Sequence, residues 1–162
     1  MNRDIVGYLL GLIIFIIGIP YIMFLAGGSP DLAEIGLIKW IILIVLAIVG
    51  IGLSVWSIVY MKNVGKGNPF DAFNHEVAPR TNSLMTEGPY GICRNPMLLG
   101  VFMYHIGVLI ALLSIGALIV FIIEVLIMNL QVKKEEERLK RDFGKEYDEY
   151  VKKSNRFMPK IR

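Results

Sequence analysis

Residues 97–132 read MLLGVFMYHIGVLIALLSIGALIVFIIEVLIMNLQV, and they indicate the architecture of the chain. The two halves of this stretch, residues 97–113 and 115–130, are 17 and 16 residues long and contain only three polar side chains. An α-helix of this length is close to what is needed to cross about 30 Å of hydrocarbon. Only Ser114 and its neighbours separate the halves. We therefore expect two transmembrane helices joined as a tight antiparallel hairpin.

Two longer apolar segments precede this hairpin. Ile5–Leu25 has 21 residues without a charge, and Ile41–Tyr60 has 20, in a helix that we expect to begin near Ile35. The first run exceeds the apolar core of a cleaved signal peptide, about 7–15 residues, so we expect it to be retained. Pro20 should kink it. The prediction is an all-α integral membrane protein with about four transmembrane helices, at residues 5–25, 36–60, 97–113 and 115–132.

Composition agrees with this fold class. Of the 162 residues, 55% are hydrophobic and 19% charged, against about 25% charged in a soluble domain. So much apolar surface excludes intrinsic disorder. One cysteine, Cys93, excludes a disulfide scaffold, and with two histidines it argues against a Cys/His metal site. We interpret Cys93 as a packed residue.

The distribution of Lys and Arg predicts the orientation in the membrane. The loop 61–96 carries four of these residues and the tail after Val132 carries eleven, whereas the segment 26–38 and the hairpin tip carry none. By the positive-inside rule, both termini and the loop 61–96 are cytoplasmic. This topology explains the net charge of +3 without a nucleic-acid partner. We predict a single membrane domain, 1–162, with a cytoplasmic cofactor-binding loop, 61–96, and a cytoplasmic C-terminal helix and tail, 133–162.

The loop 61–96 is too long for a simple connection. Structureless loops longer than about 15 residues are uncommon and often functional. This loop contains proline-rich turns together with Phe70, Phe73 and Tyr90, which are suited to covering a planar ligand. An ordered lid is the favoured interpretation, and a plain linker is the alternative.

Polar residues follow one face of the last apolar helix. At 100° per residue, Glu124, Gln131 and Glu135 lie within about 40° of one another. In the expected hairpin, His105 and Glu124 lie at equal depth, so we predict that they approach each other. Such a pair serves either to hold two helices together, which we favour, or in catalysis. Glu135 and the two glutamates after it either begin a solvated helix or face inward and hold a cation.

Three segments in the second half carry a resemblance to a known family. They are LMTEGPY at 84–90, RNPMLLG at 94–100, and the pattern of Glu135-Glu136, Phe143-Gly144, Glu146-Tyr147, Tyr150, Arg156 and Pro159 in the tail. In this order, around a helical hairpin, they resemble the isoprenylcysteine carboxyl methyltransferase family and its phospholipid methyltransferase relatives. The resemblance extends over about residues 82–159.

The resemblance implies an integral membrane enzyme that uses S-adenosylmethionine, with Glu135 as the acid on the substrate side. From the charge of Arg94 we expect it to hold a carboxylate, either that of the cofactor or that of Glu135, and we take both residues as catalytic. The expected cofactor-binding residues are His75, Asn82, Ser83, Leu84, Met85, Gly88, Tyr90, Asn95, Pro96, Met97, Leu98 and Glu136. No metal is expected.

Three positions depart from the family pattern. Asn95 and Leu98 stand where the family usually has His and Tyr, and Gln131 stands where it has a substrate-anchoring Arg. Asn cannot take up a proton near neutral pH, so a general base is not expected at position 95. Without the Arg, a prenylcysteine carboxylate is a weaker substrate candidate.

Methyl transfer is an in-line displacement that depends on positioning and on exclusion of water. We expect the acceptor to be lipophilic and to enter from the bilayer, with membrane lipids as the other partners. An amine acceptor must arrive neutral, and Glu135 or Glu136 is suited to take its proton. A phospholipid amine is thus an alternative acceptor, and an NADPH-dependent membrane reductase and a non-catalytic scaffold are alternative functions.

Overall fold

The computed structural model describes residues 3–66, 71–72, 75–76 and 83–160, which are mostly helical. Three of the described helices are long and apolar enough to cross a membrane, and the fourth apolar helix has 17 residues, near the lower limit for a span. These helices are Gly7–Ala26, Leu37–Gly65, Ile115–Phe143 and the shorter Pro96–Leu112. The prediction of an all-α membrane protein is confirmed.

The first span is interrupted by a wider winding before Pro20. Helix α1 (Arg3–Gly11) passes into a π-helical segment, Leu12–Gly18, and then into α2 (Ile19–Ala26). The N–H group of Ile19 donates to the carbonyl of Ile14, five residues earlier. In the same register, the N–H group of residue 20 would donate to the carbonyl of Phe15. Pro20 has no N–H group, and the Phe15 carbonyl is left to accept from another helix. The irregularity expected at Pro20 thus lies mainly in the turns before it.

Helix α3 (Leu37–Tyr60) continues as a π-helical turn to Gly65 and packs along α4 (Pro96–Leu112). It begins two residues later than the predicted Ile35, because Gly36 is extended. Close approach of α3 and α4 depends on two glycines. A Cβ atom on Gly50 would lie 2.2 Å from the carbonyl oxygen of Gly100, so neither position has room for a side chain.

The predicted helical hairpin is present. Leu113, with φ of 45°, turns the chain between α4 and α5 (Ile115–Phe143). The C-terminal helix predicted within 133–162 is divided, because Gly144, with φ of 52°, ends α5 and begins α6 (Lys145–Lys153). A positive φ suits glycine, which has no Cβ atom.

The prediction that His105 and Glu124 approach each other is confirmed. The Nδ1 atom of His105 lies 2.8 Å from Oε2 of Glu124, and both residues are buried. The Nε2 atom lies 2.8 Å from the carbonyl oxygen of Phe15. This contact replaces the backbone hydrogen bond that Pro20 cannot donate. The pair therefore connects α4, α5 and the first span.

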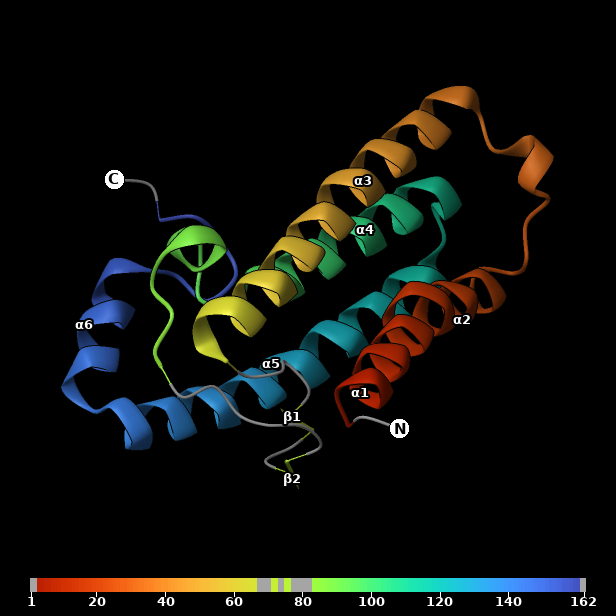
Figure 1. The fold of residues 1–162 in the computed structure, drawn as a ribbon. Helices are drawn as coiled ribbons and strands as arrows, with labels where there is room; N and C mark the ends of the chain where they lie inside the picture. The colour runs from red at the N-terminus through yellow and green to blue at the C-terminus, as the bar shows by residue number, and fades with distance from the viewer. Residues whose placement is uncertain (1–2, 67–70, 73–74, 77–82, 161–162) are drawn as a thin grey trace.

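Figure 1 shows α3 and α4 side by side, with α5 crossing beside them and α2 near the start of α5. The 113–114 turn lies at one end of the bundle. The segment 83–95 and α6 lie at the other end, where α3 ends and α4 begins. Two short antiparallel strands, β1 (Asp71–Ala72) and β2 (His75–Glu76), belong to the connection between α3 and α4.

Candidate active site

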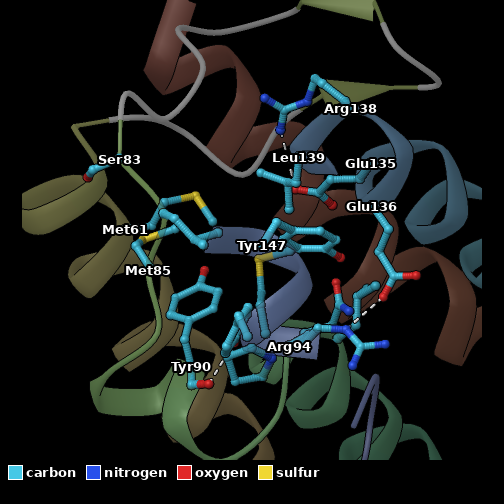
Figure 2. A pocket seen from close by; sticks show the side chains of 16 residues that line it. Met61, Ser83, Met85, Tyr90, Arg94, Glu135, Glu136, Arg138, Leu139 and Tyr147 are labelled. Carbon is cyan, nitrogen blue, oxygen red and sulfur yellow. Dashed lines mark hydrogen bonds and ion pairs between the residues drawn. The ribbon is translucent and has the colours of Figure 1, made fainter. Parts of the chain in front are cut away.

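A cleft lies at the end of the bundle where α4 begins (Figure 2). Its walls come from the end of α3, the segment 83–95, the first turn of α4, the polar half of α5, and α6. Its free volume is about 80 Å³, enough for a few water molecules. The lining residues are Met61, Ser83, Leu84, Met85, Tyr90, Arg94, Asn95, Pro96, Met97, Leu98, Glu135, Glu136, Arg138, Leu139, Tyr147 and Tyr150.

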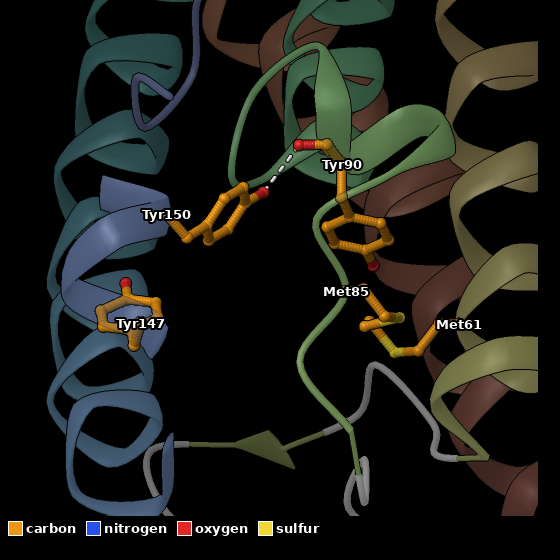
Figure 3. Close-up of a cluster of buried hydrophobic side chains, with 5 residues drawn as sticks. All are labelled: Met61, Met85, Tyr90, Tyr147 and Tyr150. Atoms are coloured by element: carbon orange, nitrogen blue, oxygen red, sulfur yellow. Dashed lines mark hydrogen bonds between the residues drawn. The ribbon is translucent and has the colours of Figure 1, made fainter. Parts of the chain in front are cut away.

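One side of the cleft is aromatic and thioether-rich (Figure 3). Met61, Met85, Tyr90, Tyr147 and Tyr150 form a buried cluster. Tyr147 and Tyr150 are three residues apart in α6, so both lie on its inner face. The hydroxyl of Tyr150 donates to the carbonyl of Tyr90 at 2.7 Å, which fixes α6 to the 88–91 turn. Methionine side chains repack easily, so this side is adaptable as well as apolar.

Gly88 shapes the turn that carries Tyr90. It has φ of +60°, and a Cβ atom there would lie 2.6 Å from Cε2 of Tyr60. The rings of Tyr60 and Tyr90 lie 6.1 Å apart. Gly88 does not line the cleft, although it was predicted to bind the cofactor. Tyr90, two residues further along this turn, lines the cleft instead.

The opposite side is polar and has Glu136 at its centre. The Nε atom of Arg94 donates to Oε1 of Glu136 at 2.9 Å, and Arg156 donates to the other carboxylate oxygen. Arg156 also donates to the side-chain oxygen of Asn129 at 2.6 Å. Arg94 was expected to hold either a cofactor carboxylate or Glu135; among the described contacts it is paired with Glu136, one residue further along. Glu136 thus binds two guanidinium groups.

The tail holds Arg94 and Asn95 through backbone hydrogen bonds. The N–H groups of Arg94 and Asn95 donate to the carbonyls of Asn155 and Arg156, at 2.8 and 3.1 Å. The side-chain amide of Asn95 donates to the same Arg156 carbonyl at 3.2 Å. The 94–95 segment is therefore fixed to the tail before α4 begins.

Glu135 lies at the more open edge of the cleft. One of its oxygens is 3.7 Å from Arg138, and its side chain is 33% exposed. Arg138 is buried and also lies 3.6 Å from Asp142. Glu135 is therefore the more accessible of the two cleft carboxylates, because the side chain of Glu136 is only 15% exposed.

Burial dominates the acid–base properties of the cleft. It raises the pKa of Tyr90, and the neighbouring carboxylate of Glu135 raises it further. Burial likewise raises the pKa of Tyr147 and of Tyr150, so all three hydroxyls stay protonated at neutral pH. The pKa of Cys93 is also raised by burial, which outweighs the opposing effects of the Asn95 backbone N–H group and of Arg94. Cys93 is a packed, fully buried thiol, as expected.

Most of the predicted site residues line this one cleft, from Ser83 through Leu98 and from α5. Asn82, Phe70 and Phe73 lie outside the described residues, as does the side chain of His75, whose backbone forms part of β2. The prediction missed five lining residues. They are Met61, Arg138, Leu139, Tyr147 and Tyr150.

Some of the missed residues had a signal in the sequence. Tyr147 and Tyr150 belong to the quoted tail motif, and their three-residue spacing was enough to place both on one helix face. Arg138 follows Glu135 by three residues, the spacing of a helical ion pair. Met61 follows an apolar helix, and nothing in the sequence distinguishes it from its neighbours.

Comparison with known proteins agrees with this geometry. The phospholipid methyltransferase family matches residues 38–146, which include α3, α4, α5 and most of the cleft. The chain matches no curated protein and no solved structure. The matched residues make up more than half of the chain, and they include helices whose side chains line the cleft. The chain belongs to the phospholipid methyltransferase family.

Proposed function

We propose that the protein transfers a methyl group from S-adenosylmethionine to a lipophilic acceptor, and that the cleft is the active site. The observation that carries this proposal is the convergence of Arg94, Glu135, Glu136 and Tyr90 in one cleft of a chain that belongs to a methyltransferase family. These residues come from segments 40 residues apart that meet only in the folded chain.

The residues of the cleft are chemically suited to this cofactor, which supplies an electrophilic methyl group when bound. Met61, Met85 and Tyr90 offer an apolar surface for a purine ring. Arg94, held in place by Glu136, offers a guanidinium group to a carboxylate. His75, Asn82, Ser83, Leu84, Asn95, Pro96, Met97 and Leu98 complete the proposed cofactor-binding set.

The acceptor is proposed to reach the cleft from the bilayer. Leu98 lines the cleft and also belongs to a buried cluster with Phe102 and Val132, against which Phe157 packs. This cluster borders the cleft at Leu98, on the side of the apolar parts of α4 and α5. A lipid chain lying along this side would bring its polar head to the glutamates.

Glu135 is proposed to act on the acceptor. Its carboxylate is the more accessible one in the cleft, and it is suited to take the proton that an ammonium head group loses before attack. Gln131 stands where a substrate-anchoring Arg is expected. This favours a phospholipid amine over a prenylcysteine carboxylate, because an amide is a poorer partner for a carboxylate than guanidinium.

We place the cleft, both termini and the loop 61–96 on the cytoplasmic side. The turn at 113–114 lies at the end of the bundle opposite α6, which fits an even number of crossings. The basic residues gather at the α6 end, in agreement with the positive-inside rule.

Calorimetric titration of the detergent-purified protein with S-adenosylhomocysteine, beside NADPH, tests the cofactor. We expect saturable binding of S-adenosylhomocysteine alone, weakened at least ten-fold, about 1.4 kcal/mol, by Tyr90→Ala. Glu135→Gln should lower methyl transfer to lipid acceptors, whereas the exposed Glu149→Gln should leave it unchanged. Folded protein that binds NADPH and not S-adenosylhomocysteine would favour the reductase, and binding of neither would favour the scaffold.

A further inference from the structure

Tyr147 carries a buried hydroxyl group. The residue is only 3% exposed and lines the cleft. Within the described part of the chain, this hydroxyl has no hydrogen-bond partner. Its neighbour on the same helix face, Tyr150, is also buried, at 8% exposed, and its hydroxyl donates to the Tyr90 carbonyl. One tyrosine of the pair is thus satisfied by the fold and the other is not.

A buried hydroxyl without a partner is unusual, because it gives up its hydrogen bonds to water without replacement. The carboxylate of Glu136 is near enough to affect the pKa of Tyr147, yet no hydrogen bond joins the two, and the oxygens of Glu136 bind Arg94 and Arg156. In Figure 2, Tyr147 lies between Tyr90 and the two glutamates, with its hydroxyl oxygen on the glutamate side. The hydroxyl is therefore a donor at the boundary between the apolar and polar sides of the cleft.

We propose that the Tyr147 hydroxyl donates a hydrogen bond to the carboxylate of the methyl donor's amino-acid portion, beside Arg94. This inference rests on the proposed function. It adds to the site a binding residue that was not among the expected cofactor-binding residues.

The chemistry around Tyr147 favours a zwitterionic ligand group. An α-amino acid presents a carboxylate and an ammonium group close together, and this end of the cleft presents guanidinium groups and carboxylates close together. Because burial raises the pKa of Tyr147, its hydroxyl keeps its proton and remains a donor. A purine ring beside Tyr90, Met61 and Met85 would direct the amino-acid portion toward this end.

The free protein provides the first test, with Tyr147→Phe and Tyr150→Phe as a matched pair. Both keep the ring, and each removes one hydroxyl. We expect the apparent Tm in detergent to stay the same or rise for Tyr147→Phe and to fall for Tyr150→Phe, which loses a hydrogen bond. An equal fall in both would overturn the proposal, because it would give the Tyr147 hydroxyl a structural partner.

Calorimetric titration with S-adenosylhomocysteine and with methylthioadenosine is the second test. The two probes share the adenosine and the thioether, and only the first has the amino-acid group. We expect Tyr147→Phe to weaken S-adenosylhomocysteine by about ten-fold or more, as for a hydrogen bond to a charged group, and to leave methylthioadenosine within about two-fold. In Tyr150→Phe the two affinities should change by the same factor.

The outcomes separate this proposal from the one on which it rests. In the first case, the wild type binds S-adenosylhomocysteine, and Tyr147→Phe either binds both probes with wild-type affinity or loses affinity for both by the same factor. The role of Tyr147 is then overturned, and the proposal of S-adenosylmethionine as cofactor stands. If folded wild-type protein does not bind S-adenosylhomocysteine, both proposals are overturned.

Discussion

Two polar clusters on α5 differ in how completely their groups are paired. In the membrane cluster, Glu124 and the Phe15 carbonyl take up both ring nitrogens of His105. In the cleft, Glu136 is shared by two arginines while the buried hydroxyl of Tyr147 has no partner among the described residues. Both clusters place a carboxylate of α5 against a group at or near α4. A saturated cluster holds helices together, and an unsaturated one retains capacity for a ligand.

The largest effect is expected from Glu124→Ala. Removing one member of a fully buried pair leaves the other without its partner and costs about 3 kcal/mol or more. We expect a large drop in the apparent Tm, measured by circular dichroism in detergent. S-adenosylhomocysteine affinity of the remaining folded protein should be unchanged, because the cluster is not part of the cleft.

A double variant shows whether this loss comes from the pair itself. His105→Leu with Glu124→Leu replaces both buried polar groups by apolar ones, which is often nearly neutral. It should recover most of the stability and lack only the hydrogen bond to Phe15. A double variant as unstable as the single one would contradict the assignment of this cluster to helix packing.

The glutamate in the cleft half of α5, Glu136, should give the opposite pattern, with a large effect on binding and a small effect on stability. Glu136→Gln removes the charge that orients Arg94, so we expect S-adenosylhomocysteine binding to weaken about ten-fold, or about 1.4 kcal/mol. The fall in apparent Tm should be smaller than for Glu124→Ala, because the side chain of Glu136 is partly exposed. Glu149→Gln, at an exposed site on α6, is the control. A Tm change as large as that of Glu124→Ala, without a change in binding, would reverse the two roles.

The sequence predicted the membrane cluster better than the cleft. Helix period and hairpin symmetry are enough to bring His105 and Glu124 to one depth, since both lie on regular helices joined by a two-residue turn. The third partner, the Phe15 carbonyl, was not predictable, because it depends on the π-helical register before Pro20.

For the cleft, motif order identified most lining residues but not their pairing. Glu135 and Glu136 are adjacent in sequence, and only the rotation of α5 decides which one faces Arg94. The missed break at Gly144 has a similar cause. The sequence around it favours helix, whereas the structure needs a left-handed residue there to fold α6 back against the 88–91 turn.

Alkaline pH should lower the stability of the folded protein through the buried tyrosines of the cleft. Because burial raises the pKa of Tyr147 and Tyr150 above the ordinary value of about 10, the folded state holds their protons more tightly than the unfolded state. Their contribution to stability is complete below about pH 10 and is lost as the pH rises further, by about 1.4 kcal/mol per pH unit for each tyrosine. The apparent Tm of Tyr150→Phe should therefore fall less steeply than that of the wild type. Parallel curves would contradict this assignment.

The smallest effect is expected from Tyr104→Phe. The hydroxyl of Tyr104 donates to the Ile16 carbonyl at 3.2 Å, next to the bond from His105 to Phe15. Hydrogen bonds between membrane helices contribute about 0.6 kcal/mol on average, so the apparent Tm should fall only slightly. S-adenosylhomocysteine affinity should not change. Tyr104→Phe and Tyr147→Phe make the same chemical change, but only Tyr104→Phe removes a hydroxyl that has a hydrogen-bond partner. A small loss of stability in Tyr104→Phe, with none in Tyr147→Phe, would support the distinction between saturated and unsaturated clusters. A loss of binding in Tyr104→Phe would connect the first span to the cleft and contradict it.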